Sequence, residues 1–271
     1  MNIAKSSSRE TISDFGTQWT RYTRSSGLHG SVETLDGLFG PLLDKRDVAD
    51  KRVADVGAGN GRYTLMFHQL GAERVLALEP SDGMATLKCN TQHLERIDYL
   101  QAPADAIPDE NFDFVFCIGV LQFIPDPQPS LRAMGRALGP NGRLFVWVYG
   151  QENNGLYLAF VRPLRWITCR LPHAALNALS ALLLLPADLY SWLSRFLPLP
   201  LGNYLRNYFS KLDRYSRKLV IYDQLNPKTA RYYRKEDLEK LFEECGFTDV
   251  RMHHHLGYSW SVLARYQGKA P

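Results

Sequence analysis

The feature that most constrains the fold is a glycine-rich turn between an apolar run and an amphipathic run. Residues 52–70 read RVADVGAGNGRYTLMFHQL. The run before the glycines predicts a short buried strand, and the apolar residues after Arg62 recur at helical spacing. The order is therefore strand, glycine turn, helix, which is the first unit of an α/β chain.

The same alternation continues along the chain. Further strands are predicted for ERVLALEP, for residues 98–101, for FDFVFCIGV and for RLFVWVYG, with a helix through Leu131, Met134 and Leu138 before the Pro140-Asn141-Gly142 turn. Strands that alternate with helices indicate an α/β fold with a doubly wound, mostly parallel sheet covered on both faces. Such a sheet binds ligands at the carboxyl ends of its strands.

The C-terminal region predicts the completion of this sheet. RKEDLEKLFEECGF at 234–247 reads as a helix with Leu238, Leu241 and Phe242 on one face, closed by Gly246. The strands TDVRMHHHL and YSWSVLARY follow so closely that they suit an antiparallel hairpin.

The spacing of the glycines indicates which classes of ligand the turn could bind. Gly57, Gly59 and Gly61 form G-x-G-x-G, whereas a dinucleotide fingerprint would need a glycine where Arg62 stands. A nicotinamide cofactor is therefore the weaker alternative, and a Walker loop is excluded because no Gly-Lys-Ser/Thr follows. The turn alone could be structural; Asp55 and Glu79, which end two neighbouring strands, favour a ligand.

VADVGAGNG resembles the cofactor loop of the class I S-adenosylmethionine-dependent methyltransferases, and the resemblance covers about residues 50–150 and the C-terminal end. It implies a Rossmann-like sheet of seven strands and S-adenosyl-L-methionine as cofactor. By this resemblance Asp55 holds the loop and the cofactor's amino group, and Glu79 accepts both ribose hydroxyls. The implied cofactor contacts from the loop and the second strand end are Gly57, Ala58, Gly59, Asn60, Gly61, Glu79 and Pro80.

Two later segments carry the same resemblance. APADAIPDENFDFVF resembles the adenine-side segment and implies contacts from Ala104 and Asp105, although Pro103 stands where many relatives have an aspartate. CIGVLQFIPD resembles the segment beneath the methionine and the methyl group, and implies contacts from Ile118 and Gly119. Many relatives have His where Gln122 stands, so Gln122 is a candidate substrate contact.

These patterns predict four regions in the 271 residues. They are an N-terminal helical lid (1–45), an S-adenosylmethionine-binding core (46–150), a helical, apolar and basic substrate cap (151–220), and a C-terminal helix and strands that complete the sheet (221–271). The cap holds nine Lys or Arg between 162 and 218 against two Asp, a net +7, so the rest of the chain carries −3 of the total +4.

The cap contains an uncharged run from Leu171 to Ala187 that is close to the minimum for crossing a bilayer. Pro172, His173, Asn177 and Pro186 interrupt it, which argues against a transmembrane helix. The plain alternative is a helical cap buried against the core with a solvated basic exterior. The functional interpretation is a lid over an apolar substrate pocket, with a peripheral membrane contact through 162–218. Nucleic acid is not expected, because leucines and prolines interrupt the basic groups.

Methyl transfer needs few catalytic side chains, because in-line placement supplies most of the acceleration. His29 is the candidate general base, against an ordinary loop histidine. By the resemblance, some of Tyr222, Asp223, Tyr232 and Tyr233 should line the pocket; the alternative is that the tyrosines are surface residues with satisfied hydroxyls. The predicted substrate contacts are Trp19, Tyr22, Gln122, Tyr222 and Tyr232. His253, His254 and His255 do not predict a metal site, because neighbours on a strand point to opposite faces.

The sequence as a whole predicts an S-adenosylmethionine-dependent methyltransferase acting on a small or lipid-like, anionic acceptor in natural-product, isoprenoid or surface-glycan biosynthesis. The alternatives are a NAD-dependent oxidoreductase and a non-catalytic cofactor-binding protein of the same fold. The N-terminus lacks a secretory signal and the four cysteines form no disulfide framework, which predicts a cytoplasmic protein, peripheral at the membrane through the cap. The acceptor atom and the oligomeric state are not predicted.

Overall fold

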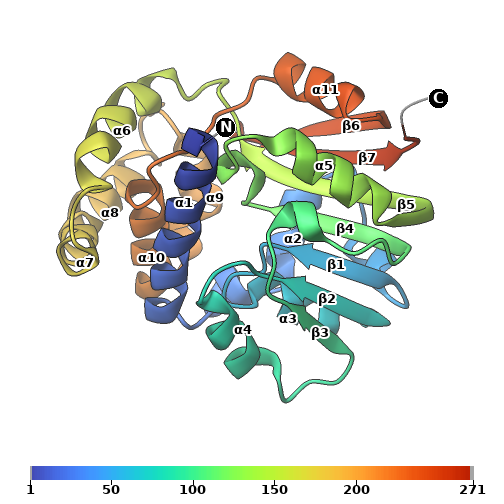
Figure 1. The fold of residues 1–271 in the computed structure, drawn as a ribbon. Coiled ribbons are helices and arrows are strands. Elements are labelled where there is room, and N and C mark those ends of the chain that lie inside the picture. The colour runs from blue at the N-terminus through green and yellow to red at the C-terminus, as the bar shows by residue number, and fades with distance from the viewer. Residues whose placement is uncertain (1, 269–271) are drawn as a thin grey trace.

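Seven strands form the central sheet of the protein, whose computed structural model describes residues 2–268. The strand order is β3-β2-β1-β4-β5-β7-β6; the first five strands pair in parallel, and β7 pairs antiparallel with β5 and with β6 (Figure 1). The predicted fold class, including the C-terminal hairpin, is confirmed. The strands are β1 (Arg52–Val56), β2 (Arg74–Leu78), β3 (Ile97–Leu100), β4 (Phe112–Ile118), β5 (Leu138–Tyr149), β6 (Phe247–His255) and β7 (Ser259–Tyr266).

Helices cover both faces of the sheet because its strands are apolar on both sides. Ala54 and Val56 of β1 pack in one core with α5 and α11, and Val53 packs in the opposite core with α2 and α3. This is the burial expected of a doubly wound sheet. The covering helices are α2 (Glu33–Phe39), α3 (Arg62–Gln69), α4 (Gly83–Thr91), α5 (Pro127–Arg136) and α11 (Lys235–Glu244).

One predicted boundary is wrong. The helix predicted through Leu138 ends at Arg136, and β5 begins at Leu138, so the Pro140-Asn141-Gly142 turn lies within the strand. Leu138 pairs with Phe112, and the register then shifts before Phe114 pairs with Arg143. Asn141 has a positive φ of 65°, and the turn is therefore absorbed as an irregularity in the ladder.

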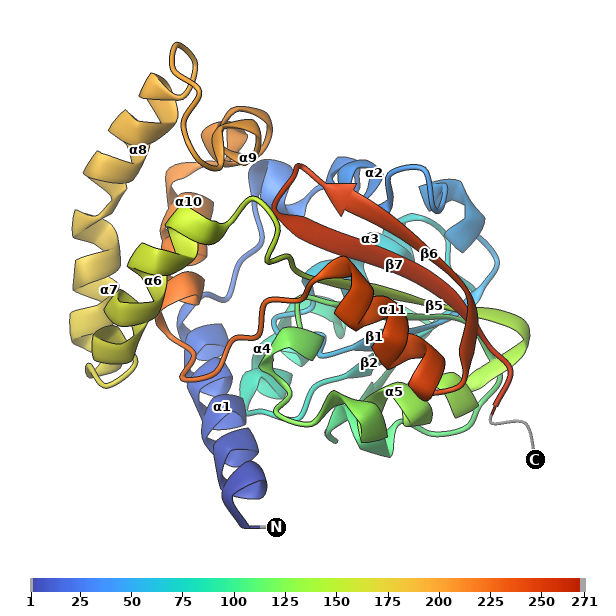
Figure 2. The same cartoon turned by 90° about the horizontal axis from the view of Figure 1, so that it is seen from above.

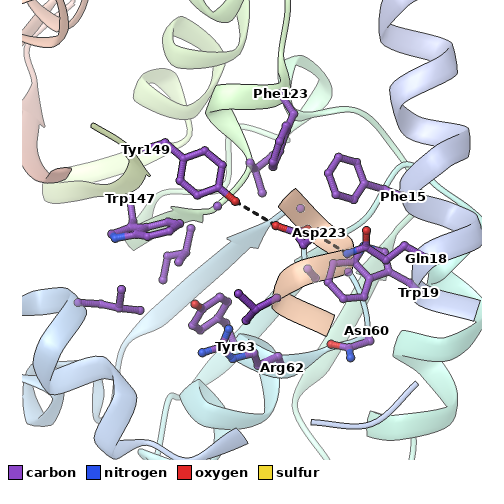
Figure 3. Close-up of a pocket in the computed structure, with 18 of the residues that line it drawn as sticks. Phe15, Gln18, Trp19, Asn60, Arg62, Tyr63, Phe123, Trp147, Tyr149 and Asp223 are labelled. Carbon is purple, nitrogen blue, oxygen red and sulfur yellow. Dashed lines mark hydrogen bonds between the residues drawn. The ribbon is translucent and has the colours of Figure 1, made fainter. Parts of the chain in front are cut away.

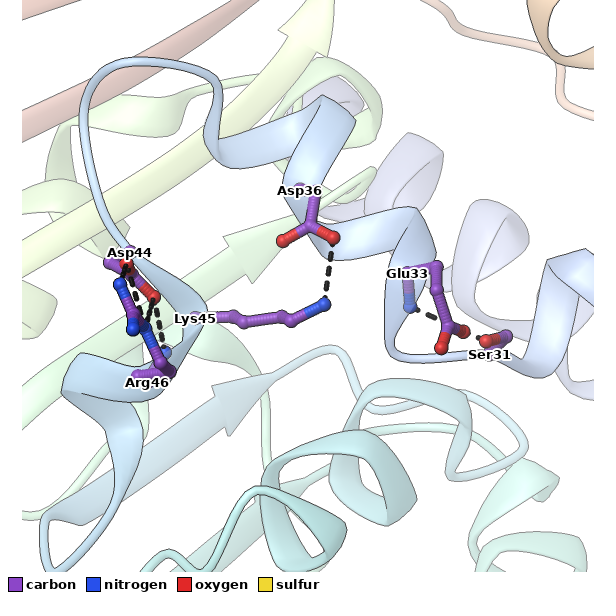
Figure 4. Close-up of polar contacts among 6 residues, drawn as sticks. All are labelled: Ser31, Glu33, Asp36, Asp44, Lys45 and Arg46. Atoms are coloured by element: carbon purple, nitrogen blue, oxygen red, sulfur yellow. Dashed lines mark hydrogen bonds and ion pairs between the residues drawn. The ribbon is translucent and has the colours of Figure 1, made fainter.

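Polar contacts fix the connection from α2 to β1 (Figure 4). Asp44 accepts a hydrogen bond from the Arg46 backbone N–H over 2.8 Å and thereby caps the short helix η2 (Lys45–Val48). Lys45 Nζ lies 2.7 Å from Asp36 Oδ2, which ties this connection back to α2. The Arg46 side chain also donates to Asp44, and these hydrogen bonds lower the pKa of that carboxyl to about 2.

Six helices, which we call the helical layer, lie together beside the carboxyl ends of the parallel strands (Figures 1 and 2). Five of them lie in the segment between β5 and α11, and the sixth is the N-terminal helix. The division at residues 45 and 220 stays a prediction: α2 packs against the sheet, and residue 220 lies inside α10. The helices are α1 (Asn2–Arg21), α6 (Gly155–Thr168), α7 (His173–Leu182), α8 (Leu184–Leu193), α9 (Gly202–Asn207) and α10 (Arg214–Leu225).

Candidate active site

A cavity of about 780 Å³ lies where the carboxyl ends of β1, β2, β4 and β5 meet α1 and α10. It has two parts. One part is lined by the glycine loop after β1 and by the ends of β2 and β4; the other is lined by aromatic side chains and by a carboxylate from α10 (Figure 3). This is the edge of a doubly wound sheet at which ligands bind.

At two glycines, the loop after β1 presents its backbone to the cavity with no side chain in between. Gly57 and Gly59 have φ of +77° and +58°, a region that favours glycine. A Cβ on Gly59 would lie 2.8 Å from Cε2 of Trp19, so the indole of α1 packs directly on this loop. Ala58 and Asn60 line the cavity as well, whereas Gly61 faces Leu87 and does not line it.

Asp55 lies behind the loop and does not line the cavity. It is fully buried, and its Oδ2 accepts a hydrogen bond of 2.6 Å from the Thr64 hydroxyl in α3. Burial raises the pKa of Asp55 to about 7, the Thr64 hydrogen bond opposes this, and the charge of Glu79 adds to it. In this structure Asp55 joins the end of β1 to the first turns of α3.

Glu79 ends β2 and lines the cavity with its carboxylate almost fully buried. Its Oε2 accepts from the Gly59 backbone N–H over 2.8 Å, and its Oε1 accepts from the Ser81 N–H over 2.9 Å and from the Ser81 hydroxyl. A carboxylate oxygen has more than one acceptor site, so both oxygens can also receive hydroxyl donors from a ligand. Pro80 lines the same wall.

The remaining predicted cofactor contacts also line this part of the cavity: Ala104, Asp105, Ile118 and Gly119. Gln122 does not. Its side chain is fully buried, and neither its amide oxygen nor its amide nitrogen has a hydrogen-bond partner among the described residues.

A carboxylate that the sequence named among the possible lining residues, but not among the predicted substrate contacts, faces the other part of the cavity. Asp223 of α10 accepts a hydrogen bond of 3.0 Å from Gln18 Nε2 of α1 and another of 3.0 Å from the Tyr149 hydroxyl of β5 (Figure 3). Tyr149 in turn accepts from Gln224 Nε2 over 2.7 Å. The spacing of the sequence could have indicated this placement. Leu219, Val220, Asp223 and Gln224 are spaced so that they share one side of a helix, and this side of α10 lines the cavity.

Burial raises the pKa values of Asp223 and of its partner Tyr149. It raises the pKa of the Asp223 carboxyl, while the hydrogen bonds from Gln18 and Tyr149 and the charge of Arg165 oppose that rise. Burial also raises the pKa of Tyr149 well above its ordinary value, so Tyr149 keeps its proton and is the donor in the pair. Asp223 is therefore a partly buried carboxylate whose proton affinity exceeds that of an exposed aspartate.

His29, the predicted base, lines the cavity but is engaged elsewhere. Its Nδ1 lies 2.9 Å from the Tyr208 hydroxyl, and its backbone carbonyl accepts from Arg62 Nε over 2.6 Å. Burial, and then the charge of Arg62, lower the pKa of His29 well below its ordinary value. The imidazole is a weak base in this position.

The predicted substrate contacts separate into two groups. Trp19 lines the cavity, whereas Tyr22, Tyr222 and Tyr232 do not. These three hydroxyls hydrogen-bond within the helical layer, Tyr22 to Asn177, Tyr222 to His173 and Tyr232 to Arg165. The histidines of β6 differ likewise: His255 lines the cavity, and His254 stacks on Trp260.

Residues 54–146 match the family model described as "Methyltransferase domain". This match supports the resemblance to the class I S-adenosylmethionine-dependent methyltransferases over the part of the chain that it covers. The chain is 30% identical over 151 residues to the ubiquinone biosynthesis O-methyltransferase of Xanthomonas oryzae pv. oryzae, covering 54% of this chain and 62% of that protein. It is 32% identical over 115 residues to a tRNA U34 carboxymethyltransferase of Campylobacter hominis, covering 40% of this chain and 39% of that protein.

The fold has relatives among solved structures too. Burkholderia thailandensis 1,6-didemethyltoxoflavin-N1-methyltransferase, solved with 1,6-didemethyltoxoflavin and S-adenosylhomocysteine, aligns with a TM-score of 0.54 at 15% identity, covering 98% of this chain and 91% of that chain. The chain shares the fold of this neighbour. It spans less than two thirds of the length of the two curated relatives named above.

The first part of the cavity fits S-adenosylmethionine, the cofactor of the methyltransferases that the chain resembles. The wall is backbone at Gly57 and Gly59, and two buried carboxylate oxygens of Glu79 stand beside it. No cation lies within ion-pair distance of them among the side chains that the structure describes, those of residues 9–268. Carboxylate oxygens that have no cation beside them suit the neutral hydroxyl groups of a ligand, and their negative charge disfavours a phosphate. Arg62 at the start of α3 reaches the His29 carbonyl, so it is not free to hold a pyrophosphate.

Proposed function

We propose that this chain transfers the methyl group of S-adenosylmethionine to a small, largely apolar acceptor held beside Asp223. The observation that carries the proposal is the two-part cavity, in which one carboxylate stands at the glycine loop and a second one, Asp223, stands among aromatic rings. About 780 Å³ lies in the upper part of the usual range for ligand pockets, roughly 300–1,000 Å³, which supports room for both a cofactor and an acceptor.

The chain's own residues would hold the cofactor in the first part. Glu79 would accept its ribose hydroxyls, the Gly57–Gly59 backbone would lie against it, and Ala104, Asp105, Ile118 and Gly119 would complete the wall. The bound cofactor supplies a methyl group on a sulfonium, which is open to in-line displacement. Trp19 closes this part from the α1 side, because its indole packs on Gly59.

The second part would hold the acceptor. Phe15, Phe123, Trp147 and Tyr149 supply flat apolar surface, and Asp223 supplies the charged group among them (Figure 3). A hydroxyl or N–H of the acceptor would donate to Asp223, which would take the proton that this atom loses as its bond to the methyl carbon forms. Gln18 and Tyr149 orient the carboxylate from two sides.

The enclosure of this carboxylate suits that role. Burial raises its pKa and so increases its affinity for a proton, while the two donors keep its ionised form accessible. The surrounding rings exclude water, so the acceptor is held against the carboxylate with little competition from solvent. The family resemblance to enzymes of ubiquinone and toxoflavin metabolism supports a small cyclic acceptor and a biosynthetic role.

Binding and turnover measured in sequence would test the proposal. Calorimetry should detect S-adenosylhomocysteine and S-adenosylmethionine but not NAD. Labelled methyl groups from S-adenosylmethionine should then appear on members of a panel of phenols and N-heterocycles. Failure to bind S-adenosylhomocysteine, or binding of NAD in its place, would overturn the cofactor assignment; tight cofactor binding without transfer to any phenol or N-heterocycle would overturn the acceptor class.

A further inference from the structure

The largest exposed apolar side chains of the protein lie on one layer of helices. Across the described side chains, every large hydrophobic residue with high exposure falls between Leu156 and Leu197, on α6, α7, α8 and the residues that follow α8. Six of them define what we call the outer face, and each is between 52% and 77% exposed: Phe160, Trp166, Leu185, Leu189, Trp192 and Phe196. A concentration of this kind marks an interaction surface.

The charges around the outer face have one sign. Between residues 155 and 198 the exposed charged side chains are Arg162, Arg170 and Arg195. The acid in this range, Asp188, lies 2.5 Å from Arg217 Nη1 and is neutralised by it, and Arg165 is buried against Tyr232. The surface thus offers aromatic and aliphatic groups together with arginines that form no ion pair with an acid among the described residues. This combination complements anionic lipid headgroups and the acyl chains beneath them.

Polar contacts hold this layer to the rest of the protein. The stretch His173–Leu193 is long and apolar enough to cross a bilayer by length and composition. However, Asn177 accepts a hydrogen bond from Tyr22, His173 Nδ1 lies 2.6 Å from the Tyr222 hydroxyl, and Leu176 packs with Leu219 of α10. Crossing the bilayer would break these contacts, whereas lying on its surface preserves them.

We infer that the outer face docks this protein on an anionic membrane surface, with α6, α7 and α8 lying along the headgroup boundary. A second copy of the chain fits this face less well, because a symmetric contact would bring Arg162, Arg170 and Arg195 of both copies together with no free acid opposite them. The same layer also supports the cavity: α10 packs on α7 through Leu219 and Tyr222 and faces the cavity through Asp223. The membrane contact therefore lies on the same helical unit that carries the acceptor carboxylate.

Vesicle flotation with the full chain tests this inference. The protein should float with vesicles of equal parts phosphatidylcholine and phosphatidylglycerol, much less with phosphatidylcholine alone, and less again at about 1 M NaCl, where the screening length is about 3 Å. The triple variant Arg162→Glu, Arg170→Glu, Arg195→Glu should lower the partition coefficient by on the order of a hundredfold, since each arginine near an anionic surface contributes about fivefold.

A matched control separates this surface from net charge. Arg136→Glu, Lys240→Glu and Arg251→Glu together make the same charge change at exposed positions outside the cap, and this variant should partition as the wild type does. The variant Phe160→Ser, Leu185→Ser, Leu189→Ser should have a partition coefficient at least about tenfold lower than that of the wild type, because it removes apolar area that enters the membrane interface. All three should keep the wild-type circular dichroism and S-adenosylhomocysteine affinity.

Three outcomes would overturn the inference. The first is no flotation of the wild type on anionic vesicles. The second is an equal loss in the two charge-reversed triples, which would mean non-specific attraction. The third is a stable dimer in sedimentation that the Phe160, Leu185 and Leu189 substitutions dissociate, which would mean that a second copy covers the outer face. None of these outcomes depends on methyl transfer, so they leave the proposed reaction untouched.

Discussion

The Tyr149 hydroxyl donates a hydrogen bond of 3.0 Å to Oδ2 of Asp223, across a separation of 74 residues. Tyr149 ends the strand β5 of the central sheet, and Asp223 lies on α10 of the helical layer. The pair therefore joins the central sheet to the helix that carries the proposed acceptor carboxylate.

Asp223→Asn should abolish most of the turnover while leaving the cofactor affinity unchanged. The amide keeps the size of the carboxylate but cannot take a proton, and a positioned general base contributes about 10²- to 10⁴-fold. The change should appear in kcat, measured with labelled S-adenosylmethionine, and calorimetry with S-adenosylhomocysteine should match the wild type. Asp188→Asn, which alters a carboxylate of the helical layer outside the cavity, is the control; equal turnover in both variants would rule out a base role for Asp223.

Tyr149→Phe should move the pH dependence without removing activity. The hydrogen bond from Tyr149 lowers the pKa of Asp223, so its loss raises that pKa further above the ordinary value. A base acts when deprotonated; kcat/KM therefore falls as the pH drops through this pKa, and that acidic limb should shift to higher pH in the variant. If Tyr149 had a purely structural role, its loss would lower activity equally at all pH values, and the acidic limb of the kcat/KM profile would stay where it is in the wild type.

Glu79→Gln should weaken S-adenosylhomocysteine binding more than it weakens the fold. Hydrogen bonds to a charged group contribute about 1.5–3 kcal/mol each, so the loss of charge should raise the dissociation constant by roughly 10- to 100-fold. The matched control is Glu73→Gln, an exposed acid that precedes the same strand. Equal dissociation constants for the two variants would contradict the placement of the ribose beside Glu79.

The sequence predicted the elements whose causes are local. The strand, glycine turn and helix of residues 52–70, the acid that ends β2 and the final hairpin all follow from short-range patterns, and the structure has them where expected. Even Glu79 could be placed at the cavity, because the end of a parallel strand fixes where its side chain lies.

What the sequence missed depends on tertiary packing. Tyr222 and Asp223 are neighbours on α10, yet one faces Tyr22 and the other faces the cavity, and nothing local decides which side of the helix packs on the sheet. His29 lines the cavity as predicted, but only the fold brings Tyr208 to its ring and Arg62 to its carbonyl. The contact of Trp19 with Gly59 joins segments 40 residues apart that carry no shared pattern.

Buried histidines should make the fold sensitive to mild acid. Burial lowers the pKa of His29 well below its ordinary value and that of His255 to about 4. Between the unfolded value of about 6.5 and these lower values the unfolded chain binds protons that the folded chain does not. The free energy of unfolding should therefore fall as the pH drops below about 6.5, by up to about 1.4 kcal/mol per pH unit for each histidine.

Urea unfolding at a series of pH values measures this slope. The double variant His29→Gln, His255→Gln should flatten it, whereas His93→Gln, which changes an exposed imidazole, should not. A slope that the double variant leaves intact would mean that other groups, the buried carboxylates among them, carry the acid sensitivity.

Gly59→Ala should lower stability for two separable reasons. Its φ of +58° is unfavourable for a residue with a Cβ, which costs about 1–2 kcal/mol. The new Cβ would also lie 2.8 Å from Cε2 of Trp19, so the indole must move off the loop. Gly155→Ala is the matched control, because a Cβ there meets nothing within 4 Å.

A double-mutant cycle with Trp19→Ala separates the two reasons. Removing the indole relieves the clash but leaves the backbone strain, so Gly59→Ala should cost less in the Trp19→Ala background than in the wild type, with a coupling of about 0.5–3 kcal/mol in the free energy of unfolding. The affinity for S-adenosylhomocysteine should fall in both single variants, since each disturbs the wall that α1 and the glycine loop form together. If the costs simply add, the indole does not rest on Gly59 in solution, and α1 then does not close the cofactor part of the cavity.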